Sequence, residues 1–339
     1  MRWLDDHLER TDKLAILVGA AAVLALGAAV GVASLAGFGA VWQRLAHSNW
    51  YWLPVALAGE IVGYLGYTLA YWKVARAERG AELELPHAAA LVTAGFGVFA
   101  AAGGFSFDAR ALARAGLSER AARARVMALG ALEYAVLAPA TAVAALVVLL
   151  QLPHVGLGLT LPWLIGVPLG VAIALLLLCH RDRFERRGGW RQKVAHLLEV
   201  VALLKCLATN PNAYGLAFVG VALYWLGDIF CLWAALHVFS AHTPPVAQLV
   251  LGYATGYALT RRTLPLGGAG IVEAFLPLAL SWIEIALAPA LLAVFAYRLI
   301  NLWLPLVPAL VSLPALRRAT RRRPRRARPA LGSSRGAAS

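Results

Sequence analysis

Long apolar blocks alternate with short polar segments along the chain. The blocks consist mostly of Leu, Ala, Val and aromatic residues, and they lie at about 14–37, 51–72, 88–104, 126–150, 159–179, 212–240, 246–260, 271–288 and 289–312. A run of roughly twenty apolar residues is what an α-helix needs to cross a bilayer core. Only helices and closed barrels satisfy their own backbone hydrogen bonds in lipid, and the sequence lacks the short alternating strands of a barrel. The pattern predicts an all-α, polytopic integral membrane protein.

The distribution of Lys and Arg predicts the topology. Basic residues concentrate in segments 73–79, 105–125 and 181–193, and short basic loops stay in the cytoplasm. The first two segments then require the same side of the membrane, although block 88–104 lies between them. That block is short and Gly-rich, so it predicts a re-entrant or broken helix. The other blocks give about eight transmembrane helices, with both termini cytoplasmic.

The chain divides into three parts. We expect a cytoplasmic N-terminus at 1–13, a transmembrane domain at 14–313 and a basic cytoplasmic tail without fixed structure at 314–339. Within the domain, about residues 190–208 have apolar side chains at helical spacing and charges elsewhere. This pattern favours an amphipathic helix lying in the membrane interface.

Composition and charge support a membrane location. The chain of 339 residues is 61% hydrophobic and 14% charged, whereas soluble domains are nearer half and a quarter. The net charge of +14 owes much to the eight arginines between Arg317 and Arg328, directly after the last block. We expect this tail to bind anionic lipid headgroups. We expect no nucleic-acid partner, because neither interleaved aromatic residues nor a folded binding module accompanies the arginines.

The three cysteines, Cys179, Cys206 and Cys231, are scattered without a CxxC pair or a metal-site spacing. We therefore expect no disulfide, no metal and no cofactor.

Charged residues interrupt the apolar blocks at six positions: Glu60, Glu133, Asp228, Glu273, Glu284 and Arg298. A charge at the centre of a span costs roughly 2.5 to 3.5 kcal/mol on insertion scales. These side chains must therefore face one another, water or a polar ligand, or bind a proton. The surplus of acids could also be met by Arg261 and Arg262, if their segment dips inward.

The stretch TRRTLPLGGAGIVEA predicts a helix break at 261–270. Pro265 removes a backbone donor, while Gly267, Gly268 and Gly270 let the chain turn freely. The apolar blocks on either side are short for complete spans. The sequence leaves open whether this break reaches the midplane of the membrane or only its cytoplasmic surface.

A helix that restarts at Gly270 or Ile271 would present free N–H groups and a positive dipole end to whatever occupies the break. An anionic group such as a lipid phosphate suits that position. Glu273 would lie in the first turn, where it could cap the helix or titrate within the site.

Two motifs resemble one known family. LPLGGAGIVEA, followed one helix later by AYRLINLWLPL, resembles the hallmark of the flippase-like transmembrane family, whose best-known members form the membrane half of lysylphosphatidylglycerol synthases. AAGGFSFDARALARAGLSERAARARVMALGALEYAVL is similar to that family's first signature, although Tyr134 stands where the family often has Arg. The resemblance covers roughly residues 10–315.

The resemblance gives weight to residues of both motifs. Together with the acids Glu60 and Asp228 of the apolar blocks, the candidate substrate-binding residues are Gly103, Gly104, Arg110, Glu133, Gly267, Gly268, Gly270, Glu273 and Arg298.

The resemblance implies that the protein moves a phospholipid or lipid-linked headgroup across a bacterial cytoplasmic membrane, without chemistry on the lipid. Only the short arginine tail follows the last block, so no acyltransferase activity is expected. An alternative is an accessory membrane scaffold for an envelope enzyme that makes lipids or glycans. A membrane-embedded enzyme with acids as general acid and base is a third interpretation, although no nucleophile–base pair or phosphate-binding loop is recognisable. The sequence leaves the lipid, the energy source and the oligomeric state open.

Overall fold

In the computed structural model, the described residues are 11–78, 80–96, 104–151, 157–179, 190–239, 243–258 and 265–305. Within these ranges every regular element is a helix, as the apolar pattern predicts. The predicted basic tail, 314–339, and most of the predicted N-terminal segment lie outside the described residues.

Among the described residues, five helices are long and apolar enough to cross a membrane. They are α2 (Thr11–Ala36), α4 (Trp52–Arg76), α7 (Glu119–Gln151), α8 (Leu157–Cys179) and α11 (Pro211–Phe239). Large apolar side chains remain exposed on them, for example Ile165, Leu169 and Ile173 along α8. An apolar outer surface of this kind is stable in lipid, so the fold is that of a polytopic membrane protein.

The last three predicted spans are shorter helices. They are α12 (Val246–Tyr253) with the π-helical turn η1 (Ala254–Ala258), α13 (Ile271–Ser281), and α14 (Leu287–Arg298) with the π-helical turn η3 (Leu299–Trp303). Because α13 ends at Ser281, Glu284 lies in the turn before α14, exposed and with φ of 71°. The assignment of Glu284 to the interior of a span is therefore wrong.

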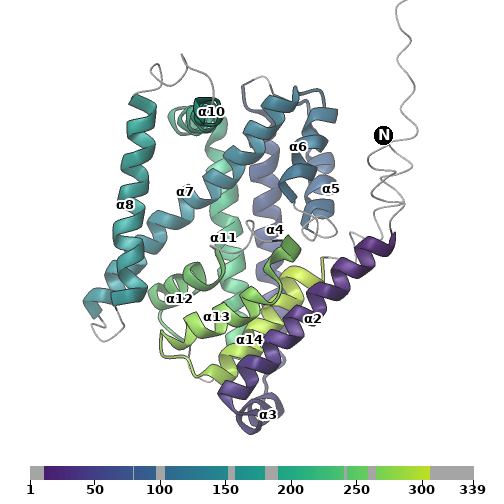
Figure 1. Ribbon diagram of the computed structural model, residues 1–339, viewed down its shortest axis with the longest axis vertical. Helices are drawn as coiled ribbons and strands as arrows, with labels where there is room; N and C mark the ends of the chain where they lie inside the picture. Colours follow the sequence, from purple (N-terminus) through teal and green to yellow (C-terminus); the bar gives the residue numbers. More distant parts are fainter. Residues whose placement is uncertain are drawn as a thin grey trace, which may run out of the picture.

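The predicted re-entrant block is not a single spanning helix. α5 (Leu85–Phe96) ends well before Gly104, where α6 (Gly104–Arg114) begins, and the two helices pack side by side (Figure 1). We call this pair the hairpin. Its second limb falls in the basic segment 105–125, beyond the predicted block 88–104, so the helical hairpin is longer than predicted.

Basic side chains gather at one end of the bundle, at the top of Figure 1, where α4 ends and α7 begins. They include Lys73, Arg76, Arg114, Arg120 and Arg123. We call this the basic end. Helix α10 (Trp190–Thr209) is seen end-on there, and an ion pair between Arg120 and Glu199 ties it to α7. The predicted helix at 190–208 is thus present, and its position in a membrane interface stays a prediction.

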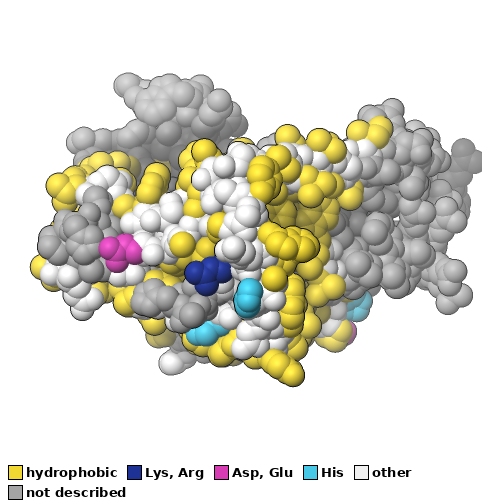
Figure 2. Space-filling view, turned by 90° about the horizontal axis from the view of Figure 1, so that it is seen from below, with side chains coloured by type: hydrophobic (Ala, Val, Ile, Leu, Met, Phe, Trp, Pro, Cys, Tyr) yellow, Lys and Arg dark blue, Asp and Glu magenta, His cyan; other side chains and the backbone are white. Residues whose placement is uncertain are grey.

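The opposite end has a different surface. Figure 2 shows it from below, with hydrophobic side chains dominating and charged side chains sparse among the described residues. The short helix α3 (Phe38–Ala46) lies at this end and exposes Phe38 and Trp42 (Figure 1). The two ends therefore differ strongly in charge.

Glycines bring α4 and α11 into close contact. A Cβ added at Gly227 would lie 2.4 Å from the backbone nitrogen of Gly63, and one added at Gly66 would lie 2.6 Å from the carbonyl oxygen of Gly220. Small residues at such spacing let transmembrane helices approach at backbone distance. The contact fixes the register of the two helices that carry Glu60 and Asp228.

Candidate functional site

The predicted helix break is present and depends on glycine. After the 3-10 turn η2 (Pro265–Gly268), α13 begins at Ile271. Gly267, Gly268 and Gly270 have φ of 61°, 71° and 85°, which glycine adopts without the strain that other residues would suffer. Arg261 and Arg262 lie outside the described residues.

The break lies beside α2. Its Gly270 packs on Leu24, near the middle of α2, and an added Cβ would lie 3.0 Å from the Leu24 Cβ. By length and composition α2 can cross a membrane, and Leu24 lies near its middle.

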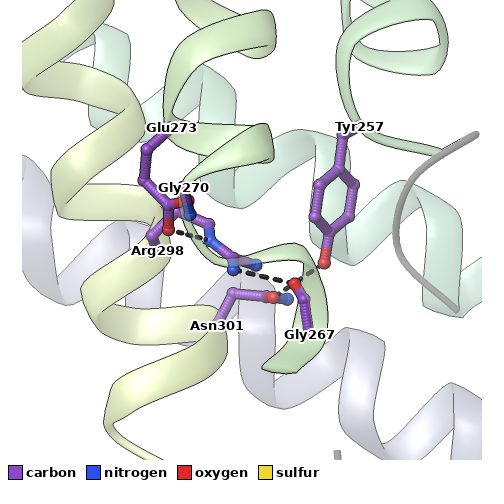
Figure 3. Close-up of polar contacts among 6 residues, drawn as sticks. All are labelled: Tyr257, Gly267, Gly270, Glu273, Arg298 and Asn301. Atoms are coloured by element: carbon purple, nitrogen blue, oxygen red, sulfur yellow. Dashed lines mark hydrogen bonds and ion pairs between the residues drawn. The ribbon is translucent and has the colours of Figure 1, made fainter. Parts of the chain in front are cut away.

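Glu273 closes the break. Its Oε2 accepts a hydrogen bond from the Gly270 N–H at 2.7 Å, and its Oε1 accepts one from Arg298 Nε at 2.8 Å. Arg298 Nη2 donates to the Gly267 carbonyl at 2.9 Å (Figure 3). We call Gly267, Gly270, Glu273 and Arg298 the break site. Its two charges are almost fully buried, with Glu273 0% and Arg298 2% exposed.

The electrostatics of the break site favour a negative group beside α13. The free N–H groups at the helix start and the Arg298 guanidinium both attract negative charge. The sequence analysis expected an anion or a capping acid here, and the capping role of Glu273 is confirmed. The chain's own carboxylate therefore fills an anion-binding position.

A second polar group surrounds Asp228. Its Oδ1 accepts hydrogen bonds from the Tyr297 hydroxyl at 2.9 Å and from Asn301 Nδ2 at 2.8 Å, while its Oδ2 accepts one from the Tyr253 hydroxyl. Asn301 Nδ2 also lies 3.1 Å from Oε1 of Glu60. We call these five residues the carboxyl cluster. It joins α4, α11, α12, α14 and η3 through their side chains.

Tyr257 connects the carboxyl cluster to the break site. Its hydroxyl donates to Asn301 Oδ1 at 2.9 Å, and its ring centroid lies 5.9 Å from Arg298 Cζ, within cation–π range (Figure 3). Changes at the break site can therefore reach Asp228 through a continuous chain of contacts.

The other predicted residues lie elsewhere. Glu133 is buried on α7, where its backbone carbonyl accepts a hydrogen bond from Trp225, whose ring lies 6.1 Å from that of Tyr253. Arg110 is exposed on α6, and Gly104 is the first residue of that helix. Gly103 lies outside the described residues. The first motif therefore builds the hairpin and the start of α7, not the break site.

The sequence analysis did not select Tyr253, Tyr257 or Asn301 as site residues. A signal was present, because the two tyrosines stand four residues apart directly before the break and Asn301 follows Arg298 by one turn. Polar residues at that spacing on an apolar helix share one face. Which face meets Asp228 depends on tertiary packing.

Comparison with protein families gives a match over most of the chain. The model described as lysylphosphatidylglycerol synthase TM region matches residues 14–309, which include every residue of the break site and the carboxyl cluster. Comparison with curated proteins found no match.

Proposed function

The chain belongs to the family of the lysylphosphatidylglycerol synthase TM region, and we propose that it moves a phospholipid or lipid-linked headgroup across the bacterial cytoplasmic membrane. Family membership relates it to lipid modification or transport in a membrane. The observation that carries the finer proposal is the break site, a buried anion-binding position inside a membrane-spanning bundle.

The ion pair suggests how a headgroup is bound. Arg298 uses two of the five N–H donors of its guanidinium on Glu273 and Gly267. A lipid phosphate that replaces the Glu273 carboxylate would meet both the guanidinium and the free N–H groups of α13. Glu273 takes up a proton from solvent water as it leaves Arg298, so one anion stands beside one cation before and after the exchange. It returns that proton and pairs with Arg298 again when the headgroup leaves, so the lipid is released unchanged.

The surface charges suggest an orientation for this transport. We propose that the basic end faces the cytoplasm, because short loops rich in Lys and Arg stay on the cytoplasmic side of a membrane. The acyl chains stay in the bilayer beside exposed apolar side chains such as Leu169 on α8. Membrane lipids are therefore the proposed partners.

A lipid-scrambling assay tests the proposal. Proteoliposomes with fluorescent phospholipid are treated with dithionite, and the wild type is expected to expose the inner-leaflet probe faster than protein-free liposomes. Glu273→Gln and Arg298→Gln each remove a charge-assisted bond and are expected to slow the rate about tenfold or more.

Glu284→Gln is the matched control, because it neutralises an exposed acid in a turn outside the site. Size-exclusion profiles confirm that the variants are folded. Equal rates for the wild type, both site variants and protein-free liposomes would overturn the proposal.

A further inference from the structure

The packing between α4 and the hairpin contains buried polar atoms that lack a hydrogen-bond partner. The described atoms of this kind include Thr68 Oγ1 and the Tyr71 hydroxyl, both on α4. Tyr71 is 2% exposed and Thr68 4%. An unsatisfied buried hydroxyl costs about 1 to 3 kcal/mol, so each one requires an explanation.

The partners of neighbouring residues show where these hydroxyls lie. Tyr64, two turns before Tyr71 on α4, donates its hydroxyl to the Ala89 carbonyl of α5 at 2.9 Å. Thr68 and Tyr71 continue the same face of α4 toward the basic end. We call Thr68, Tyr71 and the hairpin residues that face them, Gly95 and Asp108, the hairpin seam.

Asp108 supplies the opposite wall of the hairpin seam. It is buried on α6, and a Cβ added at Gly95 of α5 would lie 3.4 Å from its Oδ1. Its carboxylate interacts electrostatically with Tyr71, whose hydroxyl nevertheless forms no hydrogen bond. The seam thus offers a carboxylate acceptor near the Tyr71 hydroxyl, which can donate or accept.

We propose that the hairpin seam is a second headgroup-binding position, which takes the hydroxyl groups of a polyol headgroup such as glycerol or a sugar. One ligand hydroxyl can accept from Tyr71 and donate to Asp108, and a second can bond Thr68. These bonds would satisfy the buried hydroxyls of Tyr71 and Thr68. The inference rests on the proposed function, and it assigns hydroxyl recognition to the seam and phosphate recognition to Arg298.

The position of the seam fits such a role. Glu60 of the carboxyl cluster lies on the same helix as Tyr71, one turn before Tyr64, while Lys73 and Arg76 lie beyond Tyr71 at the basic end. A headgroup that enters at the basic end therefore meets the seam before the interior clusters. A buried water is the simpler occupant, since ordered water commonly satisfies such groups.

Two lipids with the same phosphate charge distinguish a hairpin seam that binds a headgroup from one that binds only water. Phosphatidylglycerol carries two headgroup hydroxyls, and phosphatidylpropanol carries none. Binding of each to the purified full chain in detergent is measured by native mass spectrometry, and the wild type is expected to prefer phosphatidylglycerol. Tyr71→Phe and Thr68→Val are expected to reduce that preference about two- to tenfold each, without weakening phosphatidylpropanol.

The controls distinguish the two proposals. Tyr51→Phe alters an exposed tyrosine and should leave the preference unchanged. Arg298→Gln should weaken both lipids alike. If Tyr71→Phe and Thr68→Val leave the preference intact, the seam holds water only, and the inference is overturned while the proposed function stands. If the wild type binds neither lipid, or Arg298→Gln changes nothing, the proposed function fails and the inference fails with it.

Discussion

The carboxyl cluster and the hairpin seam both include residues of α4, yet the hydrogen bonding of their buried polar groups differs. In the cluster, the hydroxyls of Tyr253 and Tyr297 both donate to Asp228. In the seam, Tyr71 is also buried, and its hydroxyl has no hydrogen-bond partner among the described residues. A network in which every polar group is hydrogen-bonded fixes how helices pack. A buried hydroxyl without a partner raises the free energy of the folded state, and a ligand that bonds to it lowers that free energy.

The break site belongs with the bonded cluster, but it adds a full ion pair. A buried ion pair contributes little net stability because desolvation offsets the attraction between its charges. It can, however, be exchanged for another ion pair of the same charge. We call the carboxyl cluster and the break site together the bonded region. In the two proposals, this region holds the bundle together and exchanges an anion, whereas the seam recognises neutral hydroxyls.

Arg298→Ala is expected to give the largest change in the bonded region. It leaves the buried Glu273 carboxylate without its cation and the Gly267 carbonyl without its donor. Removing one partner of a buried ion pair costs about 3 to 5 kcal/mol. A clear drop in the thermal unfolding temperature in detergent is expected, while Arg44→Ala, at an exposed arginine of α3, should have little effect.

The double variant Glu273→Gln/Arg298→Ala checks the cause of that drop. Because it removes the uncompensated charge as well, it should recover part of the lost stability. A double variant less stable than Arg298→Ala would mean that the cost does not come from the buried carboxylate.

The sequence predicted the local features of the bonded region well. Proline and glycine at the break, a helix start at Ile271 and an acid in its first turn are all confirmed, because each depends on neighbours within a few residues. It did not predict which acid meets which partner. Glu273 meets Arg298 on the next helix, 25 residues later, and Glu60 meets Asn301, which lies 241 residues later, through tertiary packing.

The hairpin and Glu284 show two further limits of sequence patterns. The positive charge of segment 105–125 indicated its side of the membrane, but not that α6 would keep Asp108 buried while exposing Arg110, as an amphipathic helix does. The apolar run to residue 288 hid the turn after α13, because a non-glycine residue at positive φ leaves no signal in hydropathy. Buried hydroxyls without partners are likewise visible only once the helices are packed.

Tyr257→Phe tests the link between the break site and the carboxyl cluster. It removes the hydroxyl that donates to Asn301 but keeps the ring beside Arg298. Loss of one neutral buried hydrogen bond should lower the free energy of unfolding by about 1 kcal/mol. Thermal unfolding measures the loss against Tyr51→Phe, an exposed control. A Tyr257→Phe variant as stable as that control would contradict the bonded character of the region.

Tyr71→Phe, the same substitution in the hairpin seam, is expected to have the opposite sign and the smallest size. It removes a buried hydroxyl that has no partner, so no bond is lost and a desolvation cost of the folded state disappears. The free energy of unfolding should rise by about 0.5 kcal/mol, measured in detergent without hydroxyl-bearing lipid. Added phosphatidylglycerol should stabilise the wild type more than Tyr71→Phe, because only the wild-type hydroxyl gains a partner. A variant that loses stability as Tyr257→Phe does would show that the Tyr71 hydroxyl is already bonded, and the difference between the two regions would then not exist.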